Sequence, residues 1–251
     1  MKNQKIIFLG SKPIGYYCLQ HLIAQKSALN IDIIGVLTKF NAAFDGEYDI
    51  SDLAKKNNIP LLNSIHDIPP CDILISVQHH EILKPEHISR AQTAFNLHMA
   101  PLPEYRGCNQ FSFALLDQKK EFGTTIHIMD TQIDHGDIVA EKRFSIPENC
   151  WVEDLYKITF EQSCILFKES LTSIVTNTFQ RISQESLINT RGSSLHYRNE
   201  INAIKEIDLN WDSEKIQRHI RATFMPGFEP PYAFVNNQKL FFSKTWQKEK
   251  K

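Results

Sequence analysis

Residues 5–22 read KIIFLGSKPIGYYCLQHL, an apolar run that passes through a glycine into a segment of helical spacing. Residues 5–10 form a short apolar stretch, typical of a strand buried on both faces of a parallel sheet. Pro13 suits the first turn of a helix, and apolar residues follow it at helical intervals. This segment therefore predicts a buried strand followed by a helix.

The same alternation continues through the first half of the chain. Buried strands are predicted at residues 31–37, 60–62, 71–77 and 93–97, and Ser51 is expected to cap a short helix. Strands that alternate with helices build right-handed βαβ units around a parallel sheet. We therefore predict an α/β fold with a doubly wound, mostly parallel sheet.

The pattern changes after residue 120. Residues 123–129 and 137–144 alternate as strands do around a polar loop, which predicts an antiparallel pair added to the sheet. Residues 151–174 have helical spacing, and the polar residues 183–199 indicate a long loop.

The last part of the chain is predicted to be a small unit. Residues 212–223 indicate a helix, and a turn at Asn236 and Asn237 between two apolar runs indicates a hairpin. We expect a catalytic domain at residues 1–199 and a small C-terminal subdomain at residues 200–251. Phe241 and Phe242, exposed on such a hairpin, would favour a homodimer interface.

The composition favours a cytoplasmic protein that does not bind nucleic acid. Lys plus Arg number 28 and Asp plus Glu 29, so the formal net charge is -1, whereas nucleic-acid binding usually requires a basic face. The five cysteines form no C-x-x-C pair, as expected in a reducing compartment. The first apolar run is too short for a signal peptide.

Polar residues follow three of the predicted parallel strands. Ser11 and Lys12 follow the first, residues 78–80 (Gln78, His79 and His80) follow the 71–77 strand, and Asn96 and His98 end the next. Ligands of such sheets bind at the carboxyl ends of the strands. We expect a binding site there.

Asn96 and His98 are two residues apart, so both side chains leave the same face of a strand. An amide can donate to a developing oxyanion, and an imidazole can move a proton or stabilise charge, which suits acyl transfer to an amine. Asp134 is the best candidate for a carboxylate that orients the imidazole. The plainer alternative is a pair of polar residues satisfied by the backbone.

Residues 96–107 read NLHMAPLPEYRG, residues 123–125 read GTT, and residues 134–138 read DHGDI. Together they closely resemble the signature of the 10-formyltetrahydrofolate-dependent formyltransferases, and the resemblance covers about two thirds of the chain. It implies that Asn96, His98 and Asp134 are the catalytic residues and that 10-formyltetrahydrofolate is the co-substrate.

Residues 99–110 and 221–231 look like those of the sugar-nucleotide branch that formylates 4-amino-4,6-dideoxyhexoses. This implies dTDP-4-amino-4,6-dideoxyglucose as acceptor, for bacterial surface polysaccharide (O-antigen, lipopolysaccharide) synthesis. The alternatives are GDP-perosamine, a 3-amino sugar or methionyl-tRNA. An inactive binding module and a nicotinamide oxidoreductase are rivals of other classes, and the missing G-x-G-x-x-G fingerprint disfavours the oxidoreductase.

The resemblance also implies binding residues, each of which has a purely structural alternative. The folate is expected at Gln78, His79, His80, Arg106 and Asp130. The sugar nucleotide is expected at Ser11, Lys12, Met99, Gly107, Asn109, Arg221 and Phe224.

We expect no metal and no covalent intermediate. His79, His80, His127 and His135 could form a zinc site on paper, but adjacent histidines on extended backbone point opposite ways. Cys108 lacks the strand-to-helix elbow of a nucleophile and is expected to line the pocket.

Overall fold

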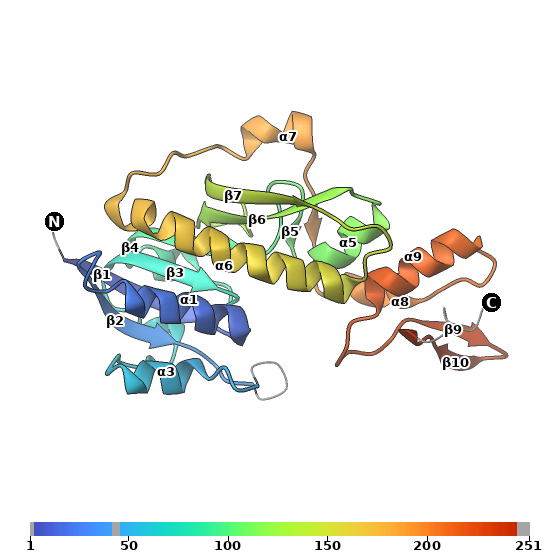
Figure 1. Cartoon of the computed structure of the whole chain (residues 1–251), viewed down its shortest axis with the longest axis horizontal. Helices are drawn as coiled ribbons and strands as arrows, with labels where there is room; N and C mark the ends of the chain where they lie inside the picture. Colours follow the sequence, from blue (N-terminus) through green and yellow to red (C-terminus); the bar gives the residue numbers. More distant parts are fainter. Residues whose placement is uncertain (1–2, 42–45, 245–251) are drawn as a thin grey trace.

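A computed structural model describes residues 3–41 and 46–244. Its centre is a six-stranded sheet with the order β2-β1-β3-β4-β6-β7 (Figure 1). The strands are β1 (Gln4–Gly10), β2 (Ile31–Leu37), β3 (Cys71–Val77), β4 (Ala91–His98), β6 (Glu121–Ile128) and β7 (Ile138–Ser145). The first four are parallel, and β6 and β7 add an antiparallel pair. The predicted fold class is confirmed.

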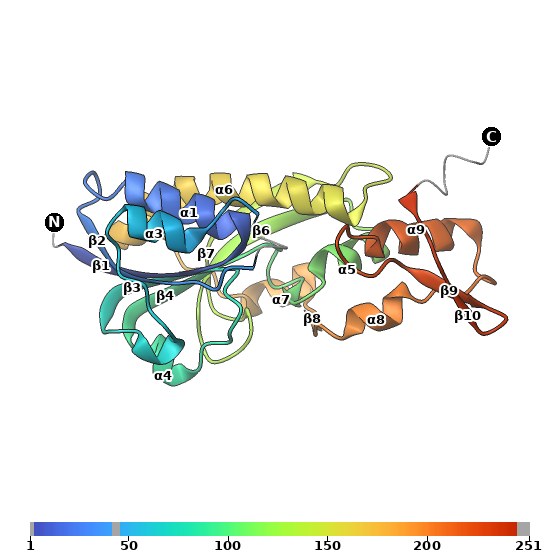
Figure 2. The same ribbon diagram turned by 90° about the horizontal axis from the view of Figure 1, so that it is seen from below.

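Helices cover both faces of this sheet (Figure 2). On one face lie α1 (Lys12–Ala24), α3 (Ile50–Lys56) and α6 (Val152–Thr176), and on the other lie the short helices η1 (Ile65–Asp67) and α4 (Pro85–Ile88). The strand β1 shows why: Ile6 and Phe8 belong to one apolar cluster, and Ile7 and Leu9 belong to the other. A strand of continuous apolar sequence is thus buried on both faces.

Two local predictions in the first half are wrong. Residues 60–62 form no strand, and only Leu61 makes an isolated bridge, to Val36, because Pro60 has no N–H to donate to a ladder. The helix α3 is capped by Asp49, whose Oδ1 accepts from the Ser51 N–H at 2.8 Å, and Ser51 lies inside the helix.

The expected loop at residues 183–199 contains a helix and a strand. The helix α7 (Glu185–Arg191) has no buried residue, so its sequence carries no apolar face to reveal it. The strand β8 (Leu195–His196) pairs in parallel with β5 (Arg106–Gly107). The short helix α5 (Gln110–Leu116), which follows β5, is a further element beyond those predicted.

The C-terminal elements are α8 (Glu200–Lys205), α9 (Ser213–Thr223), β9 (Tyr232–Val235) and β10 (Gln238–Phe241). The predicted hairpin is confirmed, since Val235 pairs with Gln238 and both turn residues, Asn236 and Asn237, have positive φ. The helix α9 packs against α5 and α6. A domain boundary at residue 199 stays a prediction. Within the described residues, none of the helices has the length and apolar character needed to cross a bilayer.

Candidate active site

The structure brings the three predicted catalytic residues together. Asn96 and His98 lie at the carboxyl end of β4. Both face Asp134, which lies on the loop between β6 and β7. Asn96 Nδ2 donates to Asp134 Oδ1 at 3.2 Å, and His98 Nδ1 lies 3.5 Å from Oδ2. An amide, an imidazole and a carboxylate therefore meet at the carboxyl end of β4.

The loop that carries Asp134 is held in an unusual backbone shape. Asp134 has a positive φ of 46°, and a Cβ added at Gly136 would lie 2.0 Å from the Ile128 carbonyl oxygen. The Gly107 N–H donates to Asp134 Oδ2 at 2.9 Å, and Arg106 Nε donates to the Ile133 carbonyl at 2.9 Å. The segment 106–107 therefore fixes this loop against the end of β4.

His98 is buried, with 5% of its surface exposed. Its Nε2 donates to the Tyr105 carbonyl at 2.8 Å, since a carbonyl oxygen can only accept. Tyr105 is itself anchored through its hydroxyl, which donates to Asp117 at 2.7 Å. Both ring nitrogens of His98 therefore have partners, and the ring is held in one orientation.

His127 is a site residue that sequence reasoning considered only as a zinc ligand. It lies opposite Asn96 in the register of β4 and β6. Its Nε2 lies 3.4 Å from Asp134 Oδ1, and its Nδ1 lies 2.9 Å from the Ile128 carbonyl. The alternation of residues 123–129 predicts the face of the strand on which His127 lies, but the pairing of the two strands is not visible in the sequence.

Gln184 was missed altogether. Its side chain is 4% exposed, and its Nε2 donates to the carbonyls of Asp134 and Gly136 at 3.0 and 2.8 Å. It ties the Asp134 loop from a segment that resembled a polar loop, so no local pattern could have identified it.

These contacts decide the charge of Asp134. Burial alone would raise the pKa of its carboxyl. The attraction of His98, the hydrogen bond and charge of His127 and the Gly107 N–H together outweigh burial and hold this pKa well below its usual range. Asp134 is therefore an anion at neutral pH.

A second group forms where β1 and β3 end side by side. The Ser11 hydroxyl donates to the Gln78 carbonyl, and Lys12 Nζ donates to Gln78 Oε1 at 3.0 Å. Residues predicted for the sugar nucleotide thus contact a residue predicted for the folate. Gln78 and Lys12 both have positive φ, so the two chain segments turn sharply here.

His79 and His80 contact each other, with ring centroids 4.6 Å apart. The expectation that they point in opposite directions is wrong, because the chain bends after β3 and is not extended. Their ligand atoms and that of Glu81 lie within 4.8 Å of one another, so this group could hold a metal ion. Burial, reinforced by His80, lowers the pKa of His79 to about 4, which leaves its ring neutral at neutral pH.

The other predicted binding residues are dispersed. Met99 is buried directly after β4, Asp130 Oδ2 pairs with His135 Nδ1 at 2.6 Å, and Asn109 Nδ2 donates to the Tyr197 carbonyl at 2.9 Å. Their predicted roles stay predictions.

Arg221 and Phe224 lie on and after α9. Phe224 packs edge-on against Trp151, with ring centroids 6.1 Å apart, and Arg221 is half-buried on α9. Among the described residues, the Asp134 side chain has Asn96, Gly107, His98 and His127 as partners, and neither Arg221 nor Phe224 is one of them. This arrangement agrees with the structural alternative, in which the two residues pack within the C-terminal part and do not bind substrate.

Comparisons with known proteins agree on one family. Residues 4–171 match the family profile described as formyl transferase. The methionyl-tRNA formyltransferase of Staphylococcus epidermidis is 29% identical over 259 aligned positions, which cover 94% of this chain and 78% of that protein. The GDP-perosamine N-formyltransferase of Brucella melitensis is 26% identical over 174 positions, which cover 68% of this chain and 63% of that protein.

Two solved structures are similar over nearly the whole chain. WlaRD, described as a sugar 3N-formyl transferase in the presence of dTDP and 5-N-formyl-THF, has a TM-score of 0.78 and 25% identity, and the match covers 95% of this chain and 85% of that one. A 4-N formyltransferase from Francisella tularensis has a TM-score of 0.75 and 18% identity, covering 96% of each chain, and this second likeness supports the fold alone.

Proposed function

The chain belongs to the formyl transferase family, and on this premise we propose that it transfers a formyl group from 10-formyltetrahydrofolate to the amine of a nucleotide-linked sugar. The observation that carries the proposal is the convergence of Asn96 and His98 on an ionised Asp134. These three side chains are proposed as the catalytic residues.

The proposed reaction is direct acyl transfer. The unprotonated sugar amine attacks the formyl carbon, and Asn96 donates a hydrogen bond to the oxyanion of the tetrahedral intermediate. His98, whose ring nitrogens face Tyr105 and Asp134, stabilises the oxyanion in its charged form. Asp134 orients His98 and helps to pass the proton lost by the attacking amine to the folate nitrogen that leaves. One such oxyanion donor contributes about 3 kcal/mol to lowering the barrier.

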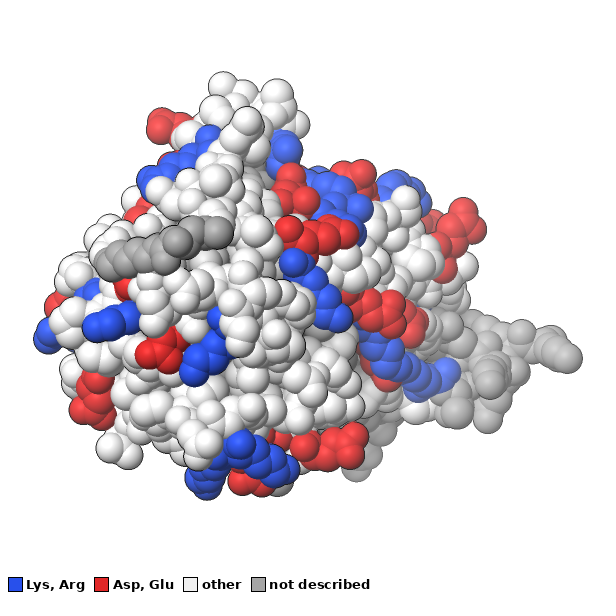
Figure 3. All heavy atoms as spheres, turned by 60° about the vertical axis from the view of Figure 1, so that its left-hand side comes forward, with Lys and Arg blue, Asp and Glu red and all other residues white. Residues whose placement is uncertain are grey.

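A sugar acceptor is favoured over tRNA by charge. The formal net charge is -1, and on the face shown in Figure 3 basic and acidic side chains are interspersed. A tRNA ligand would need a basic surface. The test is binding of initiator tRNA at physiological salt, where we expect no useful affinity. Salt-sensitive submicromolar binding, with formylation of the charged tRNA, would overturn the sugar assignment.

For the acceptor we propose dTDP-4-amino-4,6-dideoxyglucose, as part of cytoplasmic synthesis of a surface polysaccharide. The presence of dTDP in the WlaRD structure supports the carrier, whereas the Brucella relative is named for a GDP sugar. A base pocket built for thymine leaves buried polar groups unpaired with guanine, each costing about 1–3 kcal/mol. We expect kcat/KM for the dTDP sugar to exceed that for GDP-perosamine by at least about 100-fold. A preference for GDP-perosamine or a 3-amino sugar would reject this acceptor and leave formyl transfer intact.

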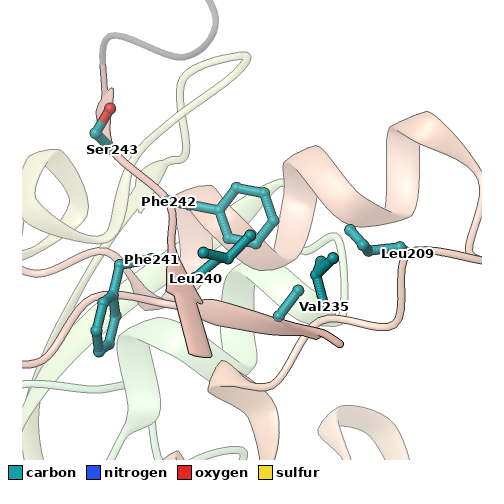
Figure 4. A pocket seen from close by; sticks show the side chains of 7 residues that line it. Leu209, Val235, Leu240, Phe241, Phe242 and Ser243 are labelled. Atoms are coloured by element: carbon teal, nitrogen blue, oxygen red, sulfur yellow. The ribbon is translucent and has the colours of Figure 1, made fainter. Parts of the chain in front are cut away.

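We also propose a homodimer formed through the hairpin β9–β10. Leu240 and Phe241 on β10 are 51% and 54% exposed, and Leu209 nearby is 51% exposed. With Val235 and Phe242 they line an apolar hollow of about 250 Å³ (Figure 4). Phe242 is only half-buried there rather than exposed as expected. Light scattering should give a dimer for the wild type and a monomer for Phe241→Asp, and a monomeric wild type would refute the proposal.

A further inference from the structure

Two imidazoles share the Asp134 carboxylate. His127 on β6 lies directly opposite Asn96 in the antiparallel register, so both side chains leave the same face of the sheet. His127 is 2% exposed, and its Nε2 lies 3.4 Å from Asp134 Oδ1. His98 approaches the other oxygen, with Nδ1 3.5 Å from Oδ2. Each carboxylate oxygen therefore has one histidine beside it.

The far nitrogen of each ring is tied to a backbone carbonyl. His98 Nε2 lies 2.8 Å from the Tyr105 oxygen, and His127 Nδ1 lies 2.9 Å from the Ile128 oxygen. A carbonyl only accepts, so each of these nitrogens carries a proton. The remaining nitrogen of each ring faces Asp134 and can bind one more proton. The two rings therefore compete for a single anionic partner.

We propose that His127 is a positioning residue that sets the protonation of His98 through their shared carboxylate. The inference rests on the proposed function, in which His98 acts on the reacting carbonyl. A proton at His127 Nε2 neutralises Asp134 and repels a second positive charge, so it disfavours protonation of His98. Other charged groups lie on the adjoining loops: Arg106 Nε donates to the Ile133 carbonyl at 2.9 Å, His135 pairs with Asp130 at 2.6 Å, and Asp137 ends the Asp134 loop.

The proton on His127 Nε2 also decides whether an N–H group of Asn96 is free to donate to the oxyanion. Asn96 Nδ2 lies 3.2 Å from His127 Nε2 and 3.2 Å from Asp134 Oδ1. Neutral His127 accepts one of the amide N–H groups. Protonated His127 cannot accept, and it donates to Asp134 instead, which releases an Asn96 N–H for the oxyanion. His127 thereby links the charge of the site to its ability to stabilise the intermediate.

The substitution His127→Gln separates these roles, because glutamine can still accept from Asn96 but binds no proton. NMR spectra of the His98 ring in the free protein should show it protonated up to a higher pH than in the wild type, since His98 then has the carboxylate to itself. In an Asp134→Asn background, His127→Gln should affect His98 much less, because only the direct repulsion between the two rings is then removed. Thr125→Ser changes a buried residue on the same face of β6 and keeps the hydroxyl that donates to the Ala100 carbonyl at 2.8 Å. It is the matched control and should behave as the wild type.

The wild type provides a measurement that needs no variant. His98 and His127 should titrate in two coupled steps, and independent single-step titrations would overturn the proposal. NMR spectra of His98 that depend on pH in the same way in folded His127→Gln as in the wild type would also overturn it. In activity assays we expect His127→Gln to lower kcat about tenfold with little change in KM and to shift the pH profile of kcat. A wild type that formylates no amino sugar would reject the proposed function, whereas the titrations would still test the role of His127.

Discussion

The carboxyl ends of β3 and β4 lie side by side but are built in opposite ways. At the end of β4, both ring nitrogens of His98 have partners, and the Asp134 carboxylate accepts from Asn96 and Gly107 with His98 beside it. At the end of β3, both ring nitrogens of His79 are enclosed and have no hydrogen-bond partner within the described residues. Buried polar atoms without partners are costly in a folded protein. The difference separates a group preorganised for chemistry from a group suited to contact a ligand.

The largest effect is expected from His98→Ala, which removes a residue at the end of β4. If His98 stabilises the transition state, kcat should fall by about 100-fold or more while folate affinity changes little. Steady-state kinetics and titration with 5-formyltetrahydrofolate measure the two quantities. Turnover close to that of the wild type would remove His98 from the mechanism.

A smaller effect is expected from a substitution that weakens the support of the Asp134 loop without changing Asp134 itself. Gln184→Ala removes two buried hydrogen bonds to the Asp134 loop, and each is worth about 0.5–1.5 kcal/mol. We expect kcat to fall about tenfold, because the carboxylate is no longer held in place. Gln20→Ala, at an exposed position on α1, is the control. Equal activity of the two variants would mean that Gln184 does not position Asp134.

A substitution at the end of β3 should lower the affinity for folate and leave kcat nearly unchanged. His79→Ala is expected to weaken 5-formyltetrahydrofolate binding about fivefold, the loss of about one hydrogen bond, with kcat nearly unchanged. His219→Ala changes another histidine whose pKa is lowered by burial and serves as control. A large loss of kcat with unaltered affinity would contradict the division between the two strand ends.

The smallest effect concerns stability against pH. The pKa of His79 is lowered to about 4, chiefly by burial, so the unfolded chain takes up a proton more readily than the folded one. Wild-type stability should therefore be complete above the ordinary histidine pKa of about 6.5 and decline as the pH falls toward the folded value. His79→Gln should lack this part of the decline. Melting temperatures of both proteins between these limits test it, and parallel curves would count against a buried neutral His79.

The six strands of the central sheet were predictable to within two residues, β1 to β4 from continuous apolar runs and β6 and β7 from alternation. The strand expected at residues 60–62 is absent, and the two-residue strands β5 and β8 were not predicted. Asn96 and His98 could be identified from their two-residue spacing, and Asp134 was assigned with the help of the family resemblance. The helix α7 escaped because it buries nothing. His127 and Gln184 escaped because their roles depend on strand register and on contacts made across 50 residues of chain. Histidine geometry after β3 was misjudged because a bend is not visible in a short polar run.

The exposure of α7 has a consequence for cleavage of the chain by a protease. Gln184, immediately before this helix, is the last residue in the sequence that holds the Asp134 loop, and α7 itself contributes no buried side chain to the core. A protease that cut the chain within α7 would leave every residue of the group from Asn96 to Gln184 on one fragment and the hairpin on the other. The cut would nevertheless separate β8 from the catalytic fragment, and β8 pairs with β5 beside the Asp134 loop. A C-terminal stretch taken from another protein would therefore have to supply this pairing to keep the catalytic group in place.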